Sequence, residues 1–329
     1  MIVESQKLNP DIFSEDVARE YTRDGYGKGL VEVADENDQV VALCADLAES
    51  TRTHWFKEKY PDRYIELGVA EQNMATVASG MANYGKIPFI ASYAAFSPGR
   101  NNEQIRTTIS LNEVPVKIVG CHAGVSVGPD GATHQALEDI ALMRVQPNMN
   151  VMVGCDMEEV RKIVHAAVKI DEPVYIRMGR SKTPMVTTKD SPLELGKANL
   201  LWESDKSEAS IIACGILVHN SLVAAKELEE EGIKVNVLNN HTIKPIDEGA
   251  VIREAQRAGA VVTVEEHQIA GGMGSAVAEV LVRNNPVPQE FVGVEDRFGQ
   301  SGQPDELIEK YGMGVEDIKK AVKRVIERK

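Results

Sequence analysis

The segment 120–135, GCHAGVSVGPDGATHQ, gathers several side chains that could do chemistry. It carries His122, Asp130 and His134, and its four glycines allow backbone conformations that other residues avoid. It follows the β-like run VPVKIVG, and in open α/β sheets the loops at the carboxyl ends of strands build the ligand site. These side chains could bind a metal, relay protons or hold an oxygen-rich substrate; the alternative is a tight surface loop with incidental polar residues. The spacing matches no zinc motif, and we expect no metal site here.

A second candidate is Glu71, in the stretch RYIELGVAEQNMATVASGM at 63–81. The apolar residues after it have helical spacing, so Glu71 begins a predicted helix, where the helix dipole favours an ionised carboxylate. A solvated glutamate in a first helical turn is the simple interpretation. The small apolar flanks instead indicate a carboxylate shielded from water, which is costly unless it has a defined hydrogen-bond donor.

Two aromatic residues and two arginines are also candidates. Tyr93 and Phe96 stand out in a chain with 5% aromatic residues, and they could either fill the core or stack on a heteroaromatic ring. Arg177 and Arg180 follow a β-like run in VYIRMGRSK. An arginine fork suits a phosphate or a carboxylate, whereas surface salt bridges are the alternative.

The elements that must position these residues alternate along the chain, with β-branched runs between helical patterns. The predicted strands are 39–44, 87–92, 114–121, 149–155, 173–178, 209–214, 234–238, 260–265 and 290–295. The predicted helices are 15–34, 71–84, 100–112, 134–144, 157–169, 218–231, 247–258, 273–284 and 315–327. The strand runs lack period-two alternation, as expected for strands covered on both faces. The sequence therefore predicts an α/β fold of mainly parallel sheets flanked by helices.

The length of 329 residues suits about two domains. The alternation breaks near 180–206, where polar residues and two prolines show no strong period, and it restarts at Ala209. We therefore predict one domain over 1–185, a linker over 186–205 and a second domain over 206–329. The glycines of GGMGSAV at 271–277 lack the third glycine of a dinucleotide fingerprint, so they predict a helix-start turn.

Charge and composition exclude several classes of partner. The chain has 36 basic and 50 acidic residues, a net charge of −14, which disfavours nucleic acid and anionic lipid. No apolar run has membrane-spanning length, and the first residues do not resemble a signal peptide. The four cysteines form no CxxC pair, which indicates buried reduced thiols. We expect a cytoplasmic protein whose loop arginines and histidines are candidate contacts for an anionic substrate.

A family resemblance extends these inferences. The motifs RYIELGVAEQNM, SYAAF, GCHAGVSVGPDGATHQALEDIALMR and VYIRMGR, in this order, resemble the pyrimidine-binding domain of transketolases. The remainder, from about residue 205, resembles the C-terminal domain of the same family. The resemblance therefore covers nearly the whole chain and implies two mainly parallel α/β domains.

The resemblance implies a thiamine diphosphate site. Glu71 matches the glutamate that contacts N1′ of the aminopyrimidine and so promotes the imino tautomer that the cofactor needs to form its carbanion. Tyr93 matches the aromatic residue that packs on the pyrimidine ring, with Phe96 beside it. Asp46, in ALCADLAES, matches a carboxylate near the cofactor.

The resemblance also implies a sugar-phosphate site. His134 and Asp130 match residues that contact the carbonyl and hydroxyl oxygens of the sugar, and His134 is the implied proton donor. The group that holds the phosphate is matched by Arg23, Ser50, His122 and Arg180. A few cationic groups in an otherwise acidic chain fit an anionic substrate.

One departure from the family separates this chain from full-length transketolases. Those enzymes carry an N-terminal domain that binds the diphosphate and Mg²⁺ through a GDG motif followed by an asparagine, and this chain has no GDG. The resemblance therefore implies the C-terminal subunit of a split transketolase, with Mg²⁺ bound by a separate N-terminal subunit. It also implies an α₂β₂ assembly, in which two copies of this chain are the β subunits.

Three alternatives stay open on the sequence. The chain could be the β subunit of a 2-oxoacid dehydrogenase or part of a deoxyxylulose-phosphate-synthase-like enzyme, although the loop that begins at His122 resembles transketolase more. It could be a non-catalytic regulatory homologue, but this is opposed by the joint retention of Glu71, Tyr93, Asp130, His134 and Arg180. An unrelated nucleotide-binding α/β protein is disfavoured by the incomplete glycine motif.

Overall fold

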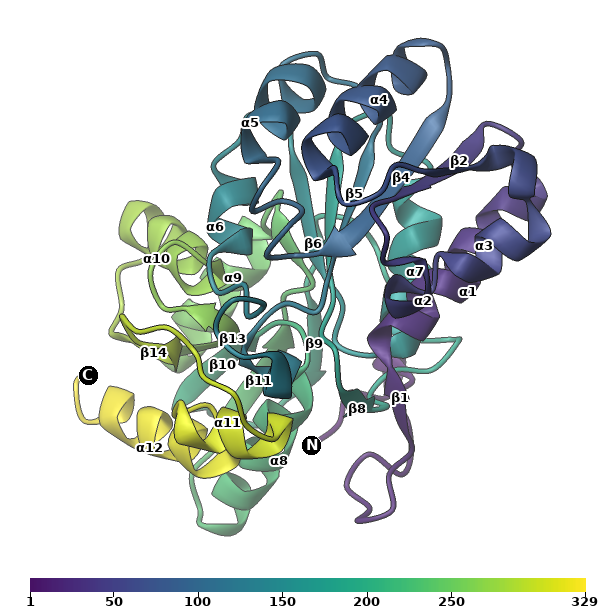
Figure 1. Ribbon diagram of the computed structural model, residues 1–329. Coiled ribbons are helices and arrows are strands. Elements are labelled where there is room, and N and C mark those ends of the chain that lie inside the picture. Colours follow the sequence, from purple (N-terminus) through teal and green to yellow (C-terminus); the bar gives the residue numbers. More distant parts are fainter.

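The computed structural model describes all 329 residues and contains two main sheets (Figure 1). The first sheet has the strand order β12-β6-β7-β5-β4-β2-β3, the second has the order β14-β13-β10-β11-β9, and β1 pairs with β8 alone. All pairs are parallel except β12 with β6, β9 with β11 and β1 with β8. The predicted class, two mainly parallel sheets flanked by helices, is confirmed. The strands are β1 (Arg19–Tyr21), β2 (Val40–Cys44), β3 (Tyr64–Glu66), β4 (Ile87–Tyr93), β5 (Lys117–Cys121), β6 (Asn150–Val153), β7 (Val174–Arg177), β8 (Lys182–Pro184), β9 (Asn199–Trp202), β10 (Ala209–Ala213), β11 (Val235–Asn239), β12 (Thr242–Lys244), β13 (Val261–Gln268) and β14 (Gln289–Val294).

Helices cover both faces of each sheet, and short 3-10 or π segments lie between them. They are η1 (Glu4–Gln6), α1 (Thr22–Glu36), α2 (Ala48–Thr51), α3 (His54–Lys59), η2 (Pro61–Arg63), α4 (Glu71–Asn83), α5 (Asn102–Gln104), η3 (Ile105–Ser110), η4 (Val125–Asp130), α6 (Asp139–Arg144), α7 (Met157–Ala167), α8 (Leu217–Glu230), α9 (Glu248–Ala258), α10 (Met273–Asn284), α11 (Pro304–Lys310) and α12 (Val315–Ile326). None of the helices is long and apolar enough to cross a membrane.

One face of the first sheet is covered by α1 and α7, which also pack against each other. Tyr26 and Leu30 of α1 and Ile163 of α7 are fully buried in one apolar cluster with Phe89 of β4. The two helices approach closely at Gly25, where a Cβ atom would lie 1.9 Å from the carbonyl oxygen of Met157. A larger residue at that position would push α1 away from α7, so the close contact requires glycine.

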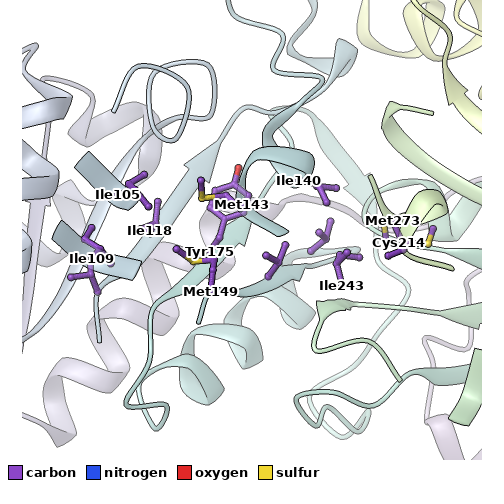
Figure 2. Packing of buried hydrophobic residues seen from close by; sticks show 14 of the residues in the cluster. Ile105, Ile109, Ile118, Ile140, Met143, Met149, Tyr175, Cys214, Ile243 and Met273 are labelled. Atoms are coloured by element: carbon purple, nitrogen blue, oxygen red, sulfur yellow. The ribbon is translucent and has the colours of Figure 1, made fainter. Parts of the chain in front are cut away.

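A single apolar core joins the two sheets. Its buried members include Ile105 and Ile118 from the first domain and Cys214, Ile243 and Met273 from the second (Figure 2). β12 extends this connection, because it comes from the second half of the chain but pairs with β6 at the edge of the first sheet. The second domain therefore has a fixed position against the first. A separate cluster around α8, α11 and α12 fills the outer side of the second sheet.

Most predicted elements are present, and the differences have local causes. The helix predicted over 15–34 begins at Thr22, because Arg19–Tyr21 forms a strand instead. The helix predicted over 134–144 begins only at Asp139, and the one predicted over 100–112 is a short α-helix continued by a π-helix to Ser110.

The segment 186–205, predicted as a linker, contains a regular element. Asn199–Trp202 forms β9, an antiparallel edge strand of the second sheet. Leu201 and Trp202 are buried there, which gives the segment a packed anchor that its polar composition did not indicate. The four cysteines are unpaired and buried, as predicted.

Candidate active site

The parallel strands of the first sheet bring the candidate residues to one edge. Tyr93 is the last residue of β4, His122 directly follows β5, and Arg180 follows β7 by three residues. Because β4, β5 and β7 are parallel neighbours, their carboxyl ends lie side by side. Asp46, two residues after β2, lies at this edge as well.

Glu71 is shielded from water and has a defined donor. It is the first residue of α4, and only 1% of its surface is exposed. Nη1 of Arg100 donates to Oε2 of Glu71 across 2.5 Å, and the Arg100 guanidinium lies over the Phe96 ring, 4.6 Å from its centroid. Glu71 is therefore a buried, ion-paired carboxylate held against an aromatic surface. The solvated alternative does not apply.

Tyr93 and Phe96 form a stacked pair at the same place. Their ring centroids are 5.9 Å apart and their planes differ by 13°. The His122 ring meets Tyr93 edge-on at 4.2 Å, and the His134 ring lies 5.3 Å from Phe96. Both aromatic side chains are half-buried, so they offer a flat apolar surface that remains accessible. The rings of Tyr93, Phe96, His122 and His134 thus lie together at the end of β4 and in the loops that follow β4 and β5.

His122 is buried and neutral. Burial and the neighbouring guanidinium of Arg23 lower the pKa of His122 to about 3. Nη1 of Arg23 lies 3.0 Å from Nε2 of His122, and since a guanidinium can only donate, Nε2 accepts and the ring proton is on Nδ1. That Nδ1 atom is buried and has no partner. An unpartnered donor at this point suits an oxygen atom of a bound ligand.

A pocket of about 230 Å³ next to His122 is cationic. It is lined by Tyr21, Arg23, Arg180, Ser181 and Lys182. Arg23 lies over the Tyr21 ring at 4.5 Å, and Nζ of Lys182 lies 5.4 Å from the same ring. With two arginines and a lysine, the pocket suits a phosphate or a similar anion. The prediction that Arg23 and Arg180 act together fits this pocket, while Tyr21 and Lys182 were missed.

The other predicted residues lie around this centre with fewer contacts. The backbone carbonyl of Ser50 accepts from Arg23 at 3.1 Å. His134 is half-buried, and its Nδ1 lies 2.8 Å from the hydroxyl of Thr133. Asp130 is exposed at the end of η4, and Asp46 is exposed, with its backbone amide bound to Glu66. Neither Asp46 nor Asp130 forms a hydrogen bond or ion pair with Tyr93, Phe96, His122 or His134, so the roles of these two aspartates stay predictions.

Arg177 does not belong to the cationic pocket. Its Nε donates to Oδ2 of Asp139 at 2.7 Å, and both side chains are almost fully buried. Arg177 therefore forms a buried salt bridge, which is neither the anion-binding fork nor the surface salt bridge considered from the sequence. Burial opposes the charge of Arg177, but the paired Asp139 keeps that guanidinium protonated.

Residues 20–185 match the family model of the transketolase pyrimidine-binding domain, and residues 196–318 match that of the transketolase C-terminal domain. The chain belongs to the transketolase family. It is 41% identical over 317 residues to a 6-deoxy-6-sulfo-D-fructose transketolase subunit of Clostridium sp. (strain MSTE9), covering 96% of this chain and 98% of that protein.

Two further relatives have a length similar to that of this chain. A putative transketolase C-terminal section of Methanocaldococcus jannaschii is 41% identical over 303 residues, which cover 91% of this chain and 94% of that protein. A solved structure described as a split gene transketolase, inactive beta4 tetramer, is 46% identical with a TM-score of 0.87. The match covers 93% of this chain and 98% of that one.

Membership of the transketolase family implies thiamine diphosphate, and the residues present fit its pyrimidine half. The half-buried faces of Tyr93 and Phe96 could pack on the pyrimidine ring, and the buried Glu71 carboxylate could contact a ring nitrogen. No group of three or more His, Cys, Asp or Glu side chains in this chain could hold a metal ion. Sequence reasoning missed Arg100, since nothing in the sequence signals that it reaches Glu71 across 29 positions.

Proposed function

We propose that this chain is the C-terminal, β subunit of a split transketolase. With a separate N-terminal subunit, it would transfer a two-carbon ketol unit from a ketose phosphate to an aldose phosphate. The observation that carries the proposal is the position of the buried Glu71 and the Tyr93–Phe96 stack next to a pocket with three cationic side chains. This arrangement would bind the pyrimidine ring of the cofactor next to a substrate that carries a terminal phosphate.

Each part of the site has a distinct task in this proposal. Held by Glu71, Tyr93 and Phe96, thiamine diphosphate would supply the carbanion chemistry that ketol transfer needs. Glu71 would hold a proton at N1′ of the pyrimidine, and the water-excluded surroundings keep that contact strong. His134 would donate a proton to sugar oxygens, with Asp130 contacting hydroxyl groups. Nδ1–H of His122 and the guanidinium groups of Arg23 and Arg180 would bind the terminal phosphate.

The partner would supply what this chain lacks. We infer that the diphosphate and Mg²⁺ bind to a chain with the GDG motif, which is absent here. Two copies of each chain would form an α₂β₂ assembly, with the cofactor between the two kinds of subunit. Two relatives that are described as a subunit and as a C-terminal section support a division into separate chains.

A coupled assay tests the proposal. The purified chain receives thiamine diphosphate, Mg²⁺, xylulose 5-phosphate and ribose 5-phosphate, with and without a GDG-bearing candidate partner. Parallel reactions replace the donor by 6-deoxy-6-sulfo-D-fructose or by pyruvate. Ketol transfer that requires both chains is the expected result. Turnover of pyruvate alone would instead assign the chain to the 2-oxoacid group, and no turnover with a folded partner would support a regulatory homologue.

A further inference from the structure

Glu266 connects the second domain to the loop that carries the substrate residues. It lies on β13, an inner strand of the second sheet, and is 3% exposed. Its carboxylate accepts from the backbone amide of Ser126 at 2.6 Å and from the Ser126 hydroxyl at 3.2 Å. Ser126 belongs to η4, four residues after His122. A side chain from the C-terminal domain therefore holds the loop of the pyrimidine-binding domain.

The fit around this contact is tight. A Cβ atom on Gly124 would lie 2.2 Å from the carboxyl carbon of Glu266, and Gly124 has a φ of +86°, a conformation that glycine adopts without strain. The backbone of Glu266 is fixed as well, because Nη2 of Arg177 donates to its carbonyl oxygen at 2.7 Å. Because Gly124 has no side chain, there is room for the Glu266 carboxylate, and Arg177 of β7 holds the part of β13 that carries Glu266.

The far end of the same loop is bound by the same domain. Nε2 of Gln135, the residue after His134, donates to the carbonyl oxygen of Gln300 at 3.0 Å. His122, four residues before the anchored Ser126, has a φ of +54°, which costs a non-glycine residue about 1 kcal/mol. Such a conformation persists only if neighbouring contacts determine it. The contacts from Glu266 and Gln300 can supply that constraint.

We propose that Glu266 is a positioning residue, which holds Ser126 and thereby keeps the 122–135 loop in the conformation that places His122 between Tyr93 and Arg23. The consequence for turnover rests on the proposed function, but the effect on the loop does not. The C-terminal domain thereby acts on the site, although none of its side chains lines the cationic pocket.

The charges around Glu266 make the contact sensitive to pH. Burial raises the pKa of Glu266 to about 7, the Asp139 carboxylate adds to that rise, and Arg177 and the Ser126 donors oppose it. The carboxylate therefore gains its charge as pH rises through about 7. A charged acceptor binds an amide more strongly than a neutral one, so the loop should be held more firmly above this pH.

The test measures the loop and the kinetics separately. Hydrogen exchange of the full chain, read on the peptide that spans 122–135, compares Glu266→Ala and Glu266→Gln with the unsubstituted protein. The matched control is Glu265→Gln, since buried Glu265 accepts from the amides of Met273 and Gly274 inside the C-terminal domain. We expect Glu266→Ala to speed exchange in this peptide about tenfold, while Glu265→Gln leaves its rate unchanged. Equal rates in Glu266→Ala and the unsubstituted protein would overturn the proposal.

Kinetics of the reconstituted complex provide the second readout. In Glu266→Ala, KM for the sugar phosphates should rise roughly tenfold. In Glu266→Gln, KM should stay close to that of the unsubstituted enzyme, because the amide oxygen of the glutamine still accepts from Ser126. The KM of the unsubstituted enzyme should fall as pH rises through about 7, whereas that of Glu266→Gln should not show this fall. If Glu266→Ala unfolds, Glu266→Gln provides the test. If KM of Glu266→Gln depends on pH in the same way as KM of the unsubstituted enzyme, the inference is contradicted. An inactive complex with a loosened loop would refute the proposed function alone.

Discussion

The guanidinium of Arg23 donates a hydrogen bond to Nε2 of His122 across 3.0 Å, although 99 positions separate the two residues in the sequence. The contact joins the start of α1 to the loop after β5, and its donor, Arg23, lines the cationic pocket. Because His122 must be neutral to accept this bond, the positive charge of the pocket comes from Arg23, Arg180 and Lys182. His122 keeps a proton on Nδ1, which has no partner within the protein.

Replacement of Glu71 should remove most of the activity without unfolding the protein. Glu71→Gln keeps the size of the side chain but cannot share a proton with a cofactor nitrogen, so turnover of the complex should fall roughly 100-fold or more. The freed Arg100 side chain is 44% exposed and can be solvated, so the thermal midpoint should change little. Glu103→Gln, an exposed glutamate on α5, is the control. Activity of Glu71→Gln equal to that control would contradict the assignment.

Arg180 should contribute specifically to binding of a phosphorylated sugar. Arg180→Ala should raise KM for xylulose 5-phosphate about 10- to 100-fold, as expected for the loss of a charge-assisted hydrogen bond, and Arg180→Lys should recover part of it. KM for the same sugar without its phosphate should change much less. Arg253→Ala, an exposed arginine on α9, controls for the loss of net positive charge. Equal increases for both sugars would mean that Arg180 does not hold the phosphate.

The fold could be predicted because buried parallel strands produce long apolar runs that recur between helical patterns. The central strands β2, β5 and β10 are fully buried along their length and were all found within a few residues. Five strands were missed: β1, β3, β8 and β12 have three residues each and β9 has four, which is too short for any periodicity to show. Their pairing depends on residues far away in the chain.

The same limit applies to the site. Residues on one motif, such as His122 and His134, could be singled out because a single loop carries them. Tyr21 and Lys182 enter the cationic pocket only because β1 pairs with β8 and places them opposite each other. Glu266 lies in the strand-like run AVVTVEEH, where a glutamate reads as a solvated strand end. Its contact with Ser126 spans 140 positions and has no local signal.

The neutral state of His122 predicts a loss of stability in acid. Its pKa is about 3 in the folded protein but ordinarily 6.5, so below pH 6.5 the unfolded chain takes up a proton that the folded chain does not. Through this residue alone, the free energy of unfolding should fall by about 1.4 kcal/mol per pH unit between pH 6.5 and 3. His122→Asn, which can still accept from Arg23, should lack this component. Urea unfolding between pH 6.5 and 4.5 compares the two proteins, and parallel pH profiles would show that His122 is not buried in its neutral form.

Glu159 predicts a trend of the opposite sign. It lies on α7, fully buried beside Asp156, and it accepts from the amide of Cys155 and from Asn239, at 2.7 Å each. Burial and the nearby Asp156 carboxylate raise the pKa of Glu159 from 4.5 to about 7. The folded protein therefore holds this proton more tightly than the unfolded chain, and the stability gained from it is lost as pH rises from about 4.5 through 7.

The difference between the unsubstituted protein and Glu159→Gln isolates this term. Glutamine stays neutral at every pH and keeps an oxygen for the Cys155 amide, so the variant should gain stability relative to the unsubstituted protein as pH rises from 5 to 8. A pKa difference of this size corresponds to a free energy on the order of 3 kcal/mol. Urea unfolding at several pH values measures it. A stability difference that stays constant from pH 5 to 8 would contradict the prediction, because it would mean that Glu159 has the same pKa in the folded and unfolded chains.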